Sequence, residues 1–150
     1  MNPTLDELED ARAGGLKAAA LILLITAGFG FFAWALSGIG HPVSALVDVT
    51  LGGLLLARYD FLKPVVLARA TIGFFSGVVV SLGGFNGSST LAFALVVGSG
   101  QILYCLSLFL LLFGVVTAAR VRVGVALFAI SILMTAASIV VIETGPAPLR

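Results

Sequence analysis

Residues 91–117 read LAFALVVGSGQILYCLSLFLLLFGVVT and contain no charged side chain. A helix needs about 20 predominantly apolar residues to cross the hydrocarbon core of a bilayer. This stretch is longer than that, so we expect a transmembrane helix that tilts or protrudes from the bilayer. The stretch therefore indicates an integral membrane protein.

The composition of the whole chain supports the same interpretation. Of its 150 residues, 60% are hydrophobic and 10% are charged, and the mean hydropathy is +1.20. Soluble domains have about a quarter of their residues charged, and disordered chains combine low hydrophobicity with high charge, so both classes are excluded. A net charge of +1 gives no strong field for nucleic acid. One cysteine and one histidine exclude an internal disulfide and a paired-histidine metal or haem site.

Four apolar runs are long enough to span a membrane, and a fifth is doubtful. The four runs cover residues 16–36, 64–82, 91–117 and 123–142. The doubtful run, 43–57, is short and contains Asp48, and it crosses only if its helix continues through Arg58, Tyr59 and Asp60. We therefore expect an all-α integral membrane bundle with five transmembrane helices, or alternatively four if residues 43–60 form a re-entrant or surface helix.

The first 15 residues differ from the rest, because they hold four of the seven acidic residues. Thr4 and Glu7 have the spacing of a capping box, in which each side chain accepts a hydrogen bond from the other's amide, so we expect a helix to begin near Leu5. We expect a short amphipathic interfacial helix over residues 1–15, with a hinge at Gly14–Gly15; a solvated acidic tail is the alternative. The transmembrane bundle would then cover 16–142, followed by a short tail at 143–150.

The basic residues gather at two turns and are absent from the loop at 83–90. The two clusters are Arg58, Lys63 and Arg69, and Arg120 and Arg122. Cytoplasmic loops carry an excess of Lys and Arg, which predicts both turns on the cytoplasmic side and the C-terminus on the non-cytoplasmic side. Five spans would place the N-terminus in the cytoplasm, and four would place it outside.

Small residues recur on one face of two predicted spans. One set is Gly73, Gly77 and Ser81, and the other is Gly124, Ser131 and Thr135. Helices associate in lipid through close packing of small residues, so these sets are candidate helix-packing faces. The spacing does not say whether the contact lies within the chain or with another subunit.

Asp48 and Arg69 are the two charged residues that lie at depth, and an intramembrane ionisable residue is a functional candidate by default. Counted from the turn at 58–63, they differ by about 10 Å in height. A long Arg side chain can extend toward the surface, so a direct pair requires Arg69 to extend deeper. Otherwise we expect Asp48 to be protonated or hydrogen-bonded to a neighbouring helix. Gln101 and Tyr104 share one face of their span and complete the intramembrane polar candidates.

No catalytic constellation accompanies these residues, and we expect no enzymatic activity and no cofactor. The sequence favours a non-catalytic structural or accessory subunit of a larger multi-subunit membrane complex, which packs against the other subunits through its small-residue helix faces. Its expected partners are bound lipids of the bilayer and other membrane-protein subunits, in a hetero-oligomer rather than a homo-oligomer, with no nucleic acid. The alternative is a small oligomeric transporter or channel that uses Asp48 and Arg69.

Overall fold

The computed structural model describes residues 4–37, 42–83 and 91–144, and these residues form helices joined by short turns. In chain order the helices are α1 (Leu5–Ser37), α2 (Pro42–Leu56), the 3-10 turn η1 (Asp60–Leu62), α3 (Lys63–Gly83), α4 (Leu91–Leu112) and α5 (Ala118–Thr144). All except α2 and η1 contain a stretch long and apolar enough to cross a membrane. The chain is thus an all-helical, multi-pass membrane bundle. Of the predicted tail, residues 143 and 144 are the last of α5, and the rest lies outside the described part.

Helix α1 begins with the predicted capping box. The Thr4 amide donates to Glu7 Oε2 at 2.9 Å, and the Glu7 amide donates to Thr4 Oγ1 at 3.3 Å. No break follows at Gly14–Gly15, so the acidic segment and the first span are one continuous helix. A Cβ atom on Gly15 would lie 2.7 Å from the carbonyl oxygen of Leu111. Gly15 therefore permits a close approach of α1 to α4 and is not a hinge.

Helix α2 ends at Leu56 and does not continue through Asp60. Its last turn closes with a Schellman motif, in which the Tyr59 amide donates to Leu54 O and the Arg58 amide donates to Leu55 O. Arg58 takes the left-handed conformation that this motif requires, with φ at 66°. At 15 residues, α2 is about 22 Å long, which is shorter than the hydrocarbon core of about 30 Å. By length, the structure therefore has four full spans, the smaller of the two expected numbers.

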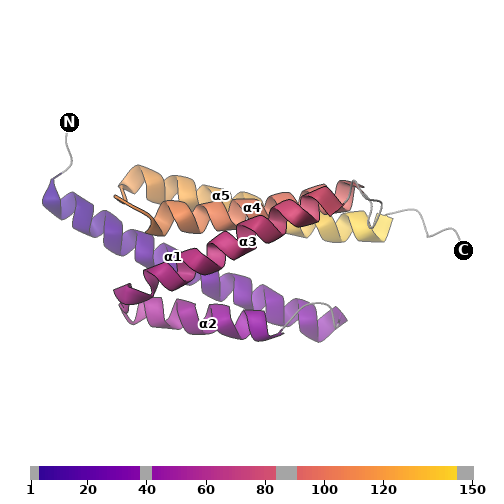
Figure 1. Cartoon of the computed structure of the whole chain (residues 1–150), viewed down its shortest axis with the longest axis horizontal. Helices are drawn as coiled ribbons and strands as arrows, with labels where there is room; N and C mark the ends of the chain where they lie inside the picture. Colours follow the sequence, from indigo (N-terminus) through magenta and orange to yellow (C-terminus); the bar gives the residue numbers. More distant parts are fainter. Residues whose placement is uncertain (1–3, 38–41, 84–90, 145–150) are drawn as a thin grey trace, which may run out of the picture.

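Successive helices run in alternating directions, so α1 begins at one end of the bundle and α5 finishes at the other (Figure 1). At the first of these ends, α2 and α4 end and α3 and α5 begin. We call it the basic end, because it holds every described Lys and Arg except Arg69: Arg12, Lys17, Arg58, Lys63, Arg120 and Arg122. We call the opposite end the far end. Although α2 is short, it runs back along α1 and not across the bundle.

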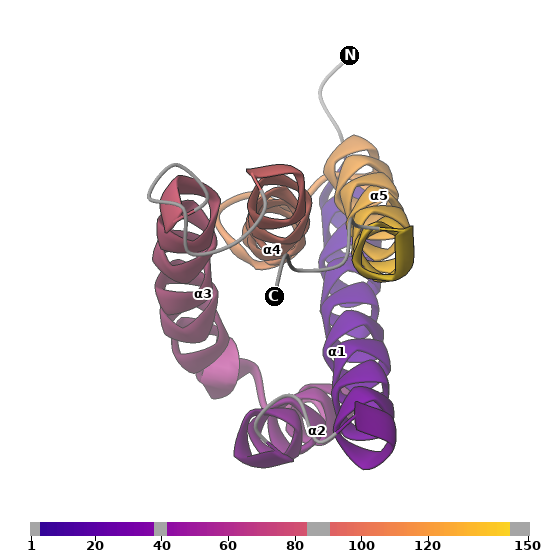
Figure 2. The ribbon, with the colours of Figure 1, turned by 90° about the vertical axis from the view of Figure 1, so that its right-hand side faces the viewer.

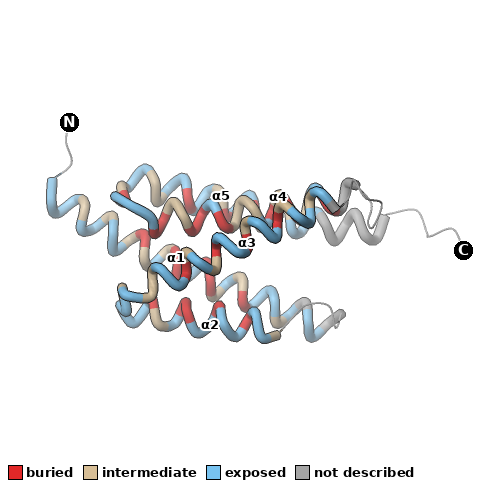
Figure 3. Tube along the Cα trace, in the orientation of Figure 1, coloured by how far each residue is buried: buried red, intermediate tan, exposed pale blue. Residues whose placement is uncertain are grey.

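The main hydrophobic core lies in the half of the bundle nearer the basic end (Figure 3). It is built from the middle of α1, the second halves of α2 and α4 and the first halves of α3 and α5. Its fully or nearly fully buried members are Ala19, Ala20, Ile22, Leu23, Leu51, Leu55, Val66, Ala70, Cys105, Leu108, Leu111, Leu112 and Phe128. Among the described residues, none from the far half belongs to this cluster, so all five helices share a core only near the basic end.

Toward the far end the helices separate into two groups. Helices α1 and α2 pack as a pair, and α3, α4 and α5 pack as a row (Figure 2). The groups meet where α1 touches α4 and α5, whereas α2 and α3 have no extensive packing with each other. Large side chains of the far half are correspondingly exposed, such as Phe32 on α1 (63%), Val43 on α2 (68%) and Val79 on α3 (67%).

The small residues of α3 lie against α4. A Cβ atom on Gly73 would lie 2.9 Å from Cys105 Sγ, and one on Gly77 would lie 3.0 Å from Gly98 O. The contact is closest at Gly98 of α4, where a Cβ atom would lie 2.6 Å from Gly77 O and would also meet Ser81. The predicted face of α3 is therefore occupied by a neighbouring helix of the same chain.

The small residues of α5 lie against the opposite side of α4. Gly124 approaches Leu111, because a Cβ atom there would lie 2.9 Å from Leu111 Cγ. Ser131 and Thr135 face Gly100, whose added Cβ atom would lie 3.4 Å from Thr135 Oγ1 and 3.5 Å from Ser131 O. Helix α4 is thus held between two small-residue contacts.

Substituting Gly98 by Ala should destabilise the bundle. The new methyl group would overlap the backbone of α3, which cannot move aside as a flexible side chain does, and overpacking of this kind costs about 1–3 kcal/mol. The midpoint of unfolding by SDS, followed by circular dichroism in mixed micelles, measures the loss. Gly53→Ala is the matched control, because nothing lies within 4 Å of a Cβ atom at that position. Equal midpoints for the two variants would contradict the close α3–α4 contact.

Candidate functional site

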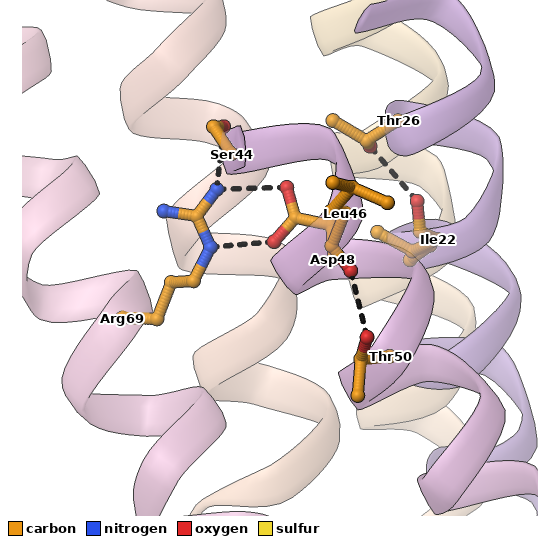
Figure 4. Close-up of polar contacts among 7 residues, drawn as sticks. All are labelled: Ile22, Thr26, Ser44, Leu46, Asp48, Thr50 and Arg69. Carbon is orange, nitrogen blue, oxygen red and sulfur yellow. Dashed lines mark hydrogen bonds and ion pairs between the residues drawn. The ribbon is translucent and has the colours of Figure 1, made fainter. Parts of the chain in front are cut away.

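A charged pair joins α2 to α3 inside the bundle (Figure 4). Arg69 Nε donates to Asp48 Oδ1, and Arg69 Nη2 donates to Asp48 Oδ2 at 2.8 Å, so the guanidinium binds the carboxylate through two parallel hydrogen bonds. Arg69 Nη2 also donates to Ser44 Oγ at 3.1 Å. The Asp48 side chain is 4% exposed and that of Arg69 is 32% exposed. The pair therefore faces inward, with the arginine at its more open side.

The pairing is direct because the two residues lie at similar depth. Asp48 lies eight residues before Leu56, the last residue of α2, and Arg69 lies six residues after Lys63, the first of α3. At 1.5 Å per residue these distances are about 12 and 9 Å. The sequence analysis predicted that Asp48 and Arg69 differ by about 10 Å in height. This was wrong, because residues of the linker between α2 and α3 were counted as helix. Arg69 therefore reaches Asp48 without extending far along the helix axis.

The pair lowers the electrostatic cost of each charge in the membrane. A single charge at bilayer depth is expensive, and such residues normally pair with each other or line a polar interior. Two parallel hydrogen bonds between guanidinium and carboxylate are the favourable geometry for such a pair. Removal of one partner would leave the other charge buried and uncompensated, which costs about 3–5 kcal/mol in protein interiors.

Two further polar candidates lie on α4 near this pair. The ring of Tyr104 packs against Phe128 with centroids 6.4 Å apart, and its buried hydroxyl makes no hydrogen bond to a residue that the structure describes. Gln101 lies beside α3, since its Nε2 would be 3.3 Å from a Cβ atom on Gly73. Unlike Tyr104, Gln101 is exposed.

Ser44 was not singled out from the sequence. It lies four residues before Asp48, on the same face of α2, and this spacing is the signal that could have identified it. Thr26 of α1 has a local partner, because its hydroxyl donates to the Ile22 carbonyl at 2.8 Å (Figure 4). Thr50 does the same with Leu46 at 2.9 Å. The Thr26 and Thr50 hydroxyls thus donate hydrogen bonds within their own helices, whereas the Ser44 hydroxyl accepts one from Arg69 of another helix.

A second charged group lies at the basic end. Arg12 Nη2 and Lys63 Nζ bind the same atom, Asp60 Oδ2, at 3.0 and 3.2 Å. Arg120 Nη1 donates to the Val115 carbonyl at 2.8 Å in the turn between α4 and α5. The two Asp60 contacts join α1, η1 and α3, whereas the Arg120 contact links the start of α5 to the turn that precedes it.

Ion pairs and hydrogen bonds between helices are the interactions that the structure shows for these groups. Within residues 4–37, 42–83 and 91–144, no three His, Cys, Asp or Glu side chains are grouped so that they could hold a metal ion. Cys105 is buried and not in a disulfide. The intramembrane pair is an ionic link between two groups of helices.

Replacing Arg69 by Met should destabilise the bundle by about 3–5 kcal/mol, because Asp48 would remain buried without its counter-charge. The double variant Asp48→Leu with Arg69→Met should recover most of this loss, since both charges are then absent. Unfolding midpoints in SDS measure all three proteins. Ser44→Ala is the control and should cost about 1 kcal/mol, because it removes one hydrogen bond and no charge. A double variant no more stable than Arg69→Met would show that the pair is not the source of the effect.

Comparison of the chain with protein-family models, curated proteins and solved structures found no match.

Proposed function

We propose that the chain is a non-catalytic structural or accessory subunit of a larger membrane complex. The observation that carries the proposal is Gln101. It lies at the middle of α4 (Leu91–Leu112), it is exposed, and its amide makes no hydrogen bond to any residue in the described ranges. A carboxamide that faces hydrocarbon without a partner costs several kcal/mol. A hydrogen-bonding side chain of another subunit would satisfy it.

The small-residue faces do not supply this partner contact. Gly73, Gly77 and Gly124 are all occupied by α4 of the same chain, so the sequence-based idea that they pack against other subunits loses its basis. The exposed surface near Gln101 is the remaining candidate. An exposed amide on an otherwise apolar helix suits a transmembrane helix of a partner that carries a polar residue.

The proposal includes an orientation in the membrane. Six of the described basic residues lie at the basic end, and cytoplasmic segments carry the excess of Lys and Arg. The basic end, with the start of α1, would then face the cytoplasm. This is the side expected for five spans, because α2 is short but still returns the chain to the basic end. The end of α5, and with it the C-terminus, would lie on the non-cytoplasmic side.

Gln101→Leu should weaken the complex. Polar side chains contribute modestly to helix association in lipid, so we expect association about three- to tenfold weaker than in the unchanged chain. The test is purification of the tagged full-length chain from its native membranes in mild detergent, with the mass of the particle and the stoichiometry of its subunits as readouts. Leu106→Ala is the control, because Leu106 is exposed on a different face of α4.

Two outcomes would contradict the subunit assignment. One is an unchanged chain that leaves native membranes as a dispersed monomer, and the other is an equal loss of association for Gln101→Leu and Leu106→Ala. Co-purification of two differently tagged copies would identify the partner as a second copy of this chain, in place of the hetero-oligomer that we favour.

A small oligomeric transporter or channel is the second candidate, and a different observation favours it. Asp48 and Arg69 link two helices that have no extensive packing with each other, so the link could open during transport. If this function is correct, vesicles containing the chain should show ion flux that falls on the order of tenfold in Asp48→Asn and Arg69→Ala. Thr50→Ala is the control, since Thr50 is exposed on the same helix and bonds only its own backbone. Flux that survives both charge variants would reject this role.

A further inference from the structure

A pocket of about 330 Å³ opens at the basic end between α1, the start of α3 and the α4–α5 turn. Most of its wall is apolar and comes from α1, α4 and the turn. Its principal lining residues are Leu8, Leu16, Leu111, Val116, Arg12 and Lys63. The two charged side chains on this wall are both cations, and no acidic side chain lines it.

The cations of this pocket exceed their counter-charges. Arg12 and Lys63 share a single carboxylate oxygen of Asp60, so one negative charge serves two positive ones. Arg120 adds a third cation at the rim, where its guanidinium binds the carbonyl oxygen of the lining residue Val115. Among the described residues, Asp60 is the one carboxylate that forms an ion pair with any of these three cations.

A neighbouring pocket of about 320 Å³ provides a comparison. It shares Arg12 and Leu16 with the first pocket, but it is also lined by Glu9 and Asp60. Its cations are Arg12, Lys17 and Arg58, so two carboxylates stand in the wall beside three positive charges. No carboxylate lines the Lys63 pocket, which favours that pocket as the site for a phosphate.

We propose that the Lys63 pocket binds the phosphate group of an anionic phospholipid. Arg12 and Lys63 contact the phosphate, and the apolar wall receives the glycerol and the first part of an acyl chain. Basic pockets between transmembrane helices on the cytoplasmic side bind lipid headgroups of this kind. The Arg12 side chain is 62% exposed, and an exposed ion pair is weak. Arg12 can therefore exchange Asp60 for a phosphate, which accepts two parallel hydrogen bonds from a guanidinium.

The apolar wall distinguishes a lipid from a free phosphate ion. An inorganic phosphate gains nothing from Leu8, Leu16 or Leu111, whereas a phospholipid buries its own apolar atoms against them. Its lining residues also lie near the ends of the spanning helices, where the headgroups of a bilayer are expected. This inference is independent of the proposed subunit role, because it concerns different residues.

The test measures phosphatidylglycerol binding to the purified full-length chain in an uncharged detergent, by native mass spectrometry over a lipid titration. We expect phosphatidylglycerol to bind more tightly than phosphatidylcholine, and Lys63→Gln to weaken phosphatidylglycerol binding about fivefold. Lys63→Arg should retain binding. Lys17→Gln is the matched control, because Lys17 lines the neighbouring pocket and not this one.

Three results would overturn the proposal. They are equal affinity for the two lipids, equal losses in Lys63→Gln and Lys17→Gln, and displacement of the lipid by inorganic phosphate at equal concentration. The last would identify a site for a free anion. Helix content by circular dichroism verifies that each variant is folded, and Arg12→Gln, which should weaken binding to a similar extent, provides a second variant if Lys63→Gln does not fold.

Discussion

The ion pair between Asp48 and Arg69 is the interaction on which the arrangement of the helices depends. Helices α1 and α2 form one group and α3, α4 and α5 form another, and no shared core joins the two groups in the far half of the bundle. The pair lies at the point where the groups begin to separate. Because each charge is unfavourable alone in a membrane, the two residues confine α2 and α3 to positions at which they can meet.

Small residues impose a complementary constraint within the second group. Gly98 allows the backbones of α3 and α4 to approach closely, and Gly100 and Gly124 do the same for α4 and α5. Packing of this kind is the main source of helix association where lipid removes the hydrophobic driving force. Close packing of small residues thus holds α3, α4 and α5 together, whereas the link between these helices and the α1–α2 pair has a strong electrostatic component.

Hydropathy alone predicted much of this fold. The four long apolar runs became the spanning helices, and the Thr4–Glu7 spacing correctly located the start of α1. The end of α2 was not predictable in the same way, because the left-handed residue of its Schellman motif is Arg58 and not the glycine that usually marks such a stop. That one boundary also changed the expected depth of Asp48.

The candidate sites were predicted less completely, for a physical reason. Sequence spacing places residues on a helix face, but it does not show which neighbour that face meets. Gly73 and Gly77 were recognised as a contact face, yet only the structure shows that α4 occupies it. The exposure of Gln101 and the shared use of Asp60 by two cations likewise depend on the positions of other helices.

The continuity of α1 has one further consequence. One continuous helix holds the acidic first turns, Arg12, Gly15 and the buried Ala19. The direction in which each of these side chains points is therefore fixed relative to the others. Insertion of a single residue between Gly15 and Ala19 would rotate everything before it by about 100° relative to the core. Arg12 would then face away from Asp60, and a side chain in place of Gly15 would face Leu111. The rotation of the acidic segment about the axis of α1 is thereby fixed relative to the membrane core.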